Sequence, residues 1–103
     1  MIRHLVHLRF AASVADDEKG ALHARLAALS GHLPGIVDFQ HRPNISPETP
    51  LVRGFVDMFW FDFSDASSRD AYLDDPVHQA IGADIVDKLE GGADGVFVCD
   101  IEL

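Results

Sequence analysis

Alternation of side chains marks the stretch from Gly54 to Ser64 as a β-strand. The side chains of its first face are Phe55, Asp57, Phe59, Phe61 and Phe63, and those of its second face are Val56, Met58, Trp60 and Asp62. Both faces are mainly apolar, whereas a strand with one face in water is apolar on one side only. The pattern therefore predicts a central strand that is covered above and below.

Three more strands are predicted from the same kind of alternation. Residues 2–10 form the first, and His4 is the only polar side chain on its otherwise apolar face. The structural explanation for a lone histidine at such a position is a hydrogen bond to a neighbour in the core. Residues 36–42 are more polar, as is typical of a sheet edge, and residues 95–103 form the last strand.

Helical spacing of apolar residues separates these strands. Leucines recur at this spacing between positions 22 and 33 and predict a helix, for which Ser13 and Asp16 resemble a capping box. Gly31 is a suitable residue to end it. The proline-rich stretch 43–52 is expected to be a loop.

A second helical unit precedes the last strand. Ser64 is expected to cap a short helix that runs through residue 73, and Asp75-Pro76 is expected to begin another, with the aspartate as its cap. Isoleucines stand three and seven positions after His78. His78 therefore shares the buried stripe of this helix.

The order strand, helix, strand, strand, helix, strand is typical of an α+β, ferredoxin-like βαββαβ fold. We expect one domain over residues 1–103, with a four-stranded antiparallel sheet, the first and third strands at its centre and helices on one face. The uncovered face carries either the set that includes His4, Val6, Leu8 and Phe59 or the opposite set. Either set is too apolar to remain in water, so the pattern predicts a homodimer in which two sheets pack or close into a barrel.

Composition narrows the class of partner. The net charge of −9, from 17 acidic and 8 basic residues, argues against nucleic acid, which requires a basic face, and against an anionic membrane. No apolar run approaches the roughly 20 residues of a membrane helix, and residues 1–10 lack the apolar core of a signal peptide. The one cysteine, Cys99, excludes an intramolecular disulfide and fits a cytoplasmic protein.

A series of short segments runs through nearly the whole chain. In order, they are Ile2-Arg3-His4-Leu5-Val6, Pro34-Gly35-Ile36, Asn44-Ile45-Ser46, Gly54-Phe55, Phe61-Asp62-Phe63, Ala71-Tyr72-Leu73 and Pro76-Val77-His78-Gln79. In these segments the chain resembles the stress-responsive A/B-barrel family of small dimeric α/β-barrel domains. The resemblance implies a dimeric barrel with a cavity in each subunit. It implies much less about chemistry, because one fold carries many functions.

Relatives with a known reaction include polyketide cyclases of the olivetolic acid cyclase type. These enzymes close a linear polyketide by an intramolecular aldol condensation without a cofactor. The resemblance implies a site made of a Tyr–His pair and a first-strand histidine, and Tyr72, His78 and His4 stand at the matching positions. Asp57 stands where that type of enzyme has another histidine, so the substrate does not carry over.

The candidate site follows if one strand face lines the cavity. The residues of that face are His4, Val6, Leu8, Phe55, Asp57 and Phe59. His78 lies in a first helical turn, where the helix dipole and burial both favour a neutral ring that can accept a proton. The Tyr72 hydroxyl can donate to a substrate carbonyl or a developing enolate. Asp57 can orient His4 or His78, as a carboxylate orients a base.

Two functions fit these residues. The first is a cofactor-free enzyme of the aldol, cyclase or lyase type that acts on a small, partly apolar carbonyl compound with His78 as base. The second is a non-catalytic ligand-binding or stress-associated dimer, in which Tyr72 is a half-buried aromatic and Asp57 pairs with a cation such as Arg53. A heme-oxidising relative on a similar barrel is a third option. No metal site is predicted, because His4 and His7 lie on opposite strand faces and cannot chelate together.

Overall fold

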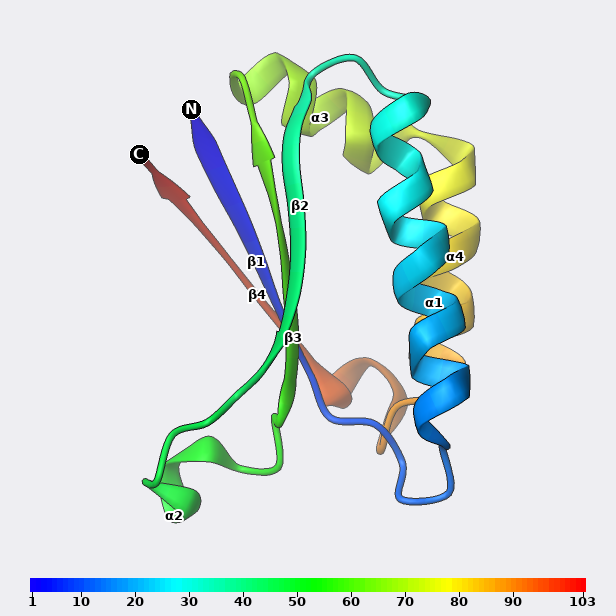
Figure 1. The fold of residues 1–103 in the computed structure, drawn as a ribbon, viewed down its shortest axis with the longest axis vertical. Helices are drawn as coiled ribbons and strands as arrows, with labels where there is room; N and C mark the ends of the chain where they lie inside the picture. Colours follow the sequence, from blue (N-terminus) through cyan, green and yellow to red (C-terminus); the bar gives the residue numbers. More distant parts are fainter.

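The computed structural model describes residues 1–103 and consists of one antiparallel sheet with its longer helices on one face (Figure 1). The strands are β1 (Ile2–Leu8), β2 (Ile36–Pro43), β3 (Asp57–Phe63) and β4 (Val96–Glu102). The helices are α1 (Asp16–Ala28), α2 (Thr49–Val52), α3 (Ala66–Asp74) and α4 (Pro76–Asp87), with 3-10 turns at Leu29–Gly31 and Gly92–Gly95. The predicted α+β, ferredoxin-like order is confirmed. None of the helices combines the length and the apolar character needed to cross a bilayer.

The first and third strands form the centre of the sheet, as expected, because the strand order is β2-β3-β1-β4. Within this register Val6 of β1 lies opposite Phe59 of β3 on one side and opposite Val98 of β4 on the other. The two chain ends also meet, since the backbone N–H of Leu103 donates to the carbonyl of Met1 at 2.8 Å. The edges of the sheet are therefore β2 and β4 (Figure 1).

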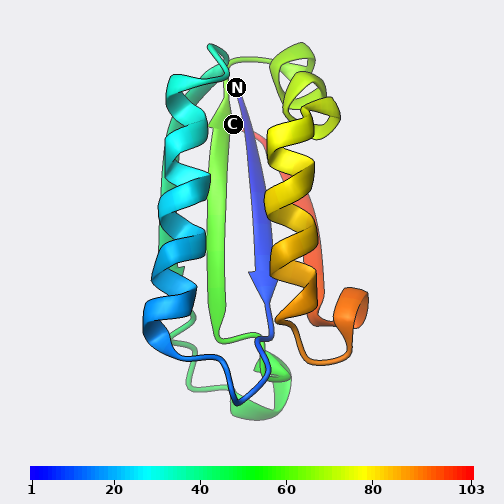
Figure 2. The ribbon, with the colours of Figure 1, turned by 90° about the vertical axis from the view of Figure 1, so that its right-hand side faces the viewer.

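The hydrophobic core lies between the sheet and the two long helices. Helices α1 and α4 lie side by side over one face of the sheet (Figure 2). The buried apolar residues are Val6, Leu8, Phe10, Leu22, Leu26, Leu29, Phe59, Phe61, Phe63, Tyr72, Ile81, Ile85 and Leu89. The sheet face that carries His4 is thus the face covered by helices within the same chain. The alternation of side chains in the sequence left open which of the two faces is covered.

The opposite face of the sheet has no long helix over it, and only the segment around α2 lies near one end of it, where residues 51–53 and Phe55 line a pocket with His7 and Phe97. Phe97 and Ile101 of β4 are exposed on it, and Trp60 of β3 is half-buried. Arg3 crosses this face to donate to both carboxylate oxygens of Asp62, at 2.8 Å and 3.0 Å. The open face therefore carries apolar side chains around an ion pair that joins two neighbouring strands.

The central strand begins later than its alternation predicts. It starts at Asp57 and not at Gly54, because the chain turns at Arg53 and Gly54, which have φ angles of 56° and 78°. Gly54 adopts its angle at little cost, whereas Arg53 is in a left-handed conformation that residues other than glycine rarely adopt. The expected loop 43–52 also contains the one-turn helix α2.

Two helix caps differ from those predicted. Helix α1 is preceded by Ala15, whose backbone N–H donates to the Glu18 side chain at 3.3 Å, so Ser13 is not its cap. Helix α3 is capped by Asp65, which accepts from the backbone N–H of Ser68 at 2.8 Å. An aspartate is as good a cap as serine, and here it stands one residue after the predicted Ser64. The cap predicted at Asp75 is confirmed.

Candidate functional site

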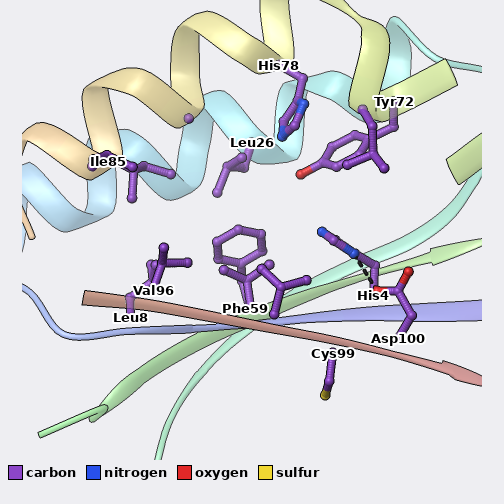
Figure 3. Close-up of a pocket in the computed structure, with 15 residues that line it drawn as sticks. His4, Leu8, Leu26, Phe59, Tyr72, His78, Ile85, Val96, Cys99 and Asp100 are labelled. Carbon is purple, nitrogen blue, oxygen red and sulfur yellow. Dashed lines mark hydrogen bonds and ion pairs between the residues drawn. The ribbon is translucent and has the colours of Figure 1, made fainter. Parts of the chain in front are cut away.

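A cavity of about 410 Å³ lies between the sheet and the helices (Figure 3). Small-molecule sites in proteins typically have volumes of about 300–1,000 Å³. The lining residues are His4, Val6, Leu8, Leu26, Phe59, Tyr72, Leu73, His78, Gly82, Ile85, Val86, Val96, Val98, Cys99 and Asp100. Most of these side chains are apolar, and the few polar groups gather at one end.

His4 is fixed on the floor of the cavity by a carboxylate. The residue is only 5% exposed, and its Nδ1 lies 2.7 Å from Oδ1 of Asp100, the residue directly opposite on β4. An ionised carboxylate can only accept, so Nδ1 carries the hydrogen and donates it. The other ring nitrogen of His4 points up into the cavity (Figure 3).

Tyr72 and His78 are brought together by a break between two helices. Asp75 ends α3 in an extended conformation, because a residue that precedes proline disfavours the helical region. It then caps α4 by accepting from the backbone N–H of His78 at 2.9 Å. The rings of Tyr72 and His78 stack as a result, with centroids 3.7 Å apart.

The three side chains face a common space. The ring centroids of His4 and Tyr72 lie 5.6 Å apart in an edge-on arrangement. The Tyr72 hydroxyl and the distal edge of the His78 ring both point into the cavity above His4 (Figure 3). A small molecule in this cavity can contact all three residues at once.

Burial sets the protonation states of the pair on the helices. It lowers the pKa of His78 and outweighs the backbone of Tyr72 and the charge of Asp75, which both raise that pKa. Burial also raises the pKa of Tyr72. Near neutral pH, His78 is therefore an uncharged acceptor, and Tyr72 keeps its hydroxyl proton. Nδ1 of His78 is buried without a hydrogen-bond partner.

Two of the predicted site residues do not reach the cavity. Asp57 pairs with Lys19 at 3.0 Å, so it orients neither His4 nor His78. The ring of Phe55 lies under the guanidinium of Arg9, 4.9 Å from its centroid. Val6, Leu8 and Phe59 do line the cavity together with the three polar residues.

The sequence prediction missed Asp100. On an edge strand this residue has the pattern of a solvated surface acid, and only strand pairing places it beside His4. Cys99 comes next to it, but its side chain points away from the cavity (Figure 3). No cluster of three or more His, Cys, Asp or Glu side chains is arranged to hold a metal ion.

The fold and the site define a ferredoxin-like α+β domain with a mostly apolar cavity between its sheet and its helices. The chain belongs to the stress responsive A/B barrel domain family, whose model matches residues 2–103. The family expected from the sequence segments is thereby confirmed.

Three known structures are similar over the whole chain. A dimeric ferredoxin-like protein of unknown function from Jannaschia sp. CCS1 is 34% identical, with a TM-score of 0.88, and the match covers 99% of this chain and 98% of that one. A protein of Arabidopsis thaliana is 20% identical, with a TM-score of 0.88 and coverage of 100% and 95%. A hydroxynitrile lyase from Passiflora edulis is 14% identical, with a TM-score of 0.83 and coverage of 99% and 92%. The last two show the fold alone, and no curated protein matches the sequence.

Proposed function

We propose that the cavity binds a small, partly apolar carbonyl compound and that the protein is a cofactor-free enzyme of the aldol, cyclase or lyase type. The observation that carries this proposal is the convergence of His4, Tyr72 and His78 on one largely apolar cavity. A few polar groups in an apolar pocket fix the orientation of a ligand, and the apolar wall excludes water.

The roles follow from the protonation states. The Tyr72 hydroxyl donates to the substrate carbonyl oxygen, and neutral His78 takes a proton from the carbon next to that carbonyl. The electron pair of the broken C–H bond moves into an enolate, which Tyr72 stabilises. In the aldol direction the enolate carbon then forms a C–C bond to a second carbonyl carbon, whose oxygen takes the proton from His78. The reverse sequence cleaves the same bond.

A homodimer belongs to the same proposal. The Jannaschia relative is dimeric, and so are ferredoxin-like proteins from Thermobifida fusca and Bacteroides fragilis. In this chain the sheet face opposite the helices exposes Phe97 and Ile101. Covering that face with a second copy removes apolar area from water.

Binding without chemistry is the second candidate. The observation that favours it is the Nδ1 atom of His78, which has no carboxylate partner. Histidine bases are typically oriented by a carboxylate or a carbonyl at the other ring nitrogen. In this chain His4, and not His78, has a carboxylate partner.

Deuterium exchange into phenylacetone tests the enzymatic proposal, because exchange at its acidic carbon requires a base but no product. We expect the protein to accelerate the exchange. The variants His78→Gln and Tyr72→Phe should each lower the rate on the order of 100-fold and still bind phenylacetone by NMR titration.

The matched control is His41→Gln, which removes an exposed histidine on β2 that does not line the cavity. It should leave the exchange rate unchanged. Binding of phenylacetone with no acceleration in the wild type would instead support the non-catalytic alternative. Equal rates in the wild type and His78→Gln would remove His78 as the base.

A further inference from the structure

We infer that Asp100 and Arg69 are positioning residues that hold His4 with a bare nitrogen facing the cavity, and that the preferred ligand therefore carries a hydroxyl or enol O–H besides its carbonyl. The inference rests on the proposed function of the cavity and narrows the class of its ligand. It starts from a chain of contacts that crosses three elements, β1, β4 and α3.

The Asp100 carboxylate is held from two sides. Its Oδ1 lies 2.7 Å from Nδ1 of His4, and its Oδ2 accepts from Nη1 of Arg69 at 3.0 Å. The charge-assisted hydrogen bond from the guanidinium fixes the direction of the carboxylate. An ionised carboxylate accepts only, so Nδ1 of His4 must be the protonated nitrogen.

This tautomer decides what the cavity can recognise. A neutral imidazole with a hydrogen on Nδ1 has only a lone pair on Nε2. In Figure 3 that nitrogen points into the space bounded by the Tyr72 hydroxyl. The site therefore offers a donor at Tyr72 and an acceptor at His4, and these complement a ligand that has a carbonyl acceptor and an O–H donor.

Helix α3 links the two groups. Arg69 and Tyr72 stand three residues apart on it, so they lie on neighbouring positions of one helix face. The helix that presents the Tyr72 hydroxyl also anchors, through Arg69, the carboxylate that orients His4. Arg69 contacts a second acid, Asp70, at 3.0 Å, and Asp70 is not among the residues that line the cavity.

Long-range proton–nitrogen NMR on the full chain tests the positioning role, because it reports which ring nitrogen of His4 is protonated. We expect the Nδ1–H tautomer in the wild type and in the matched control Asp70→Ala. Asp100→Ala should shift His4 toward the Nε2–H tautomer that predominates in free neutral histidine. If Asp100→Ala does not fold, Arg69→Met, which removes the anchor of the carboxylate, should weaken the same preference.

The ligand class is tested with benzylacetone and its β-hydroxy derivative, which differ by one hydroxyl group. The hydroxy compound should bind the wild type and Asp70→Ala about 3- to 10-fold more tightly, as expected for one additional hydrogen bond. Asp100→Ala should lose this preference.

An unchanged His4 tautomer in Asp100→Ala, or an equal shift in Asp70→Ala, would overturn the inference. So would equal binding of the two compounds to the wild type. A failure of the proposed function gives a different result, in which neither compound binds while the tautomer of His4 still follows Asp100.

Discussion

The polar residues of the cavity differ in the hydrogen-bond partners of their side chains. His4 has a carboxylate partner at 2.7 Å, whereas His78 is desolvated, and its Nδ1 has no partner. With its hydrogen on Nδ1, neutral His4 presents the lone pair of Nε2 to the cavity, and desolvated His78 is a second acceptor. Tyr72 lies between them as the donor, since burial raises the pKa of its hydroxyl.

Stability should fall when the protein is acidified. Burial lowers the pKa of His7, His23 and His78 in the folded chain, whereas the unfolded chain binds these protons near the ordinary histidine pKa of about 6.5. Below that pH the unfolded state binds more protons, so the free energy of unfolding decreases until the folded pKa is passed. The full stability is present above the unfolded pKa of about 6.5.

Urea unfolding at a series of pH values between about 7.5 and 5 measures this effect. His78→Gln cannot take up the proton at position 78, so its unfolding free energy should depend less steeply on pH than that of the wild type. A wild-type stability that stays constant or rises on acidification would contradict the assignment of a desolvated, neutral His78.

At the level of elements, strand alternation predicted which face each side chain occupies. It put His4, Val6, Leu8 and Phe59 on one face, and they do line the cavity. Alternation does not say how far along the strand a cavity extends. Asp57, the first residue of β3, lies opposite Leu8 and pairs with Lys19 of α1, so it shares the face but not the site.

The sequence pattern does not predict contacts between elements that are far apart in the chain. Asp100 joins the site only through the register of β4 on β1, and its second partner, Arg69, comes from α3. The helix break was easier to predict, because Asp75-Pro76 is a local signal for a cap followed by the first helical residue. That break is what stacks Tyr72 on His78.

At the scale of the whole molecule, both faces of the sheet carry apolar side chains, but long helices cover only one of these faces. The helices enclose the cavity within each chain, so the proposed partner copy covers the opposite face. That face includes Phe97, which is 56% exposed, and the Arg3–Asp62 ion pair. The site and the proposed dimer contact therefore lie on opposite sides of the same sheet.

Sedimentation of two variants, each with one substitution on the protein surface, tests this arrangement. Phe97→Glu places a charge on the open face and should shift the protein to monomers at micromolar concentration. Val77→Glu introduces the same charge at a comparably exposed apolar position on α4 and should leave the dimer intact. A wild type that sediments as a monomer, or a dimer that both variants retain, would refute the predicted interface.

The central claim is that His4, Tyr72 and His78 form one ligand site between the sheet and the helices. Its most direct test is an NMR titration of the labelled protein with phenylacetone that follows the two histidine rings and the methyl groups of Val6 and Val98. We predict saturable shifts that are confined to these cavity residues. Shifts that gather on the open face of the sheet around Phe97, or no saturable shift at His4 and His78, would contradict the claim.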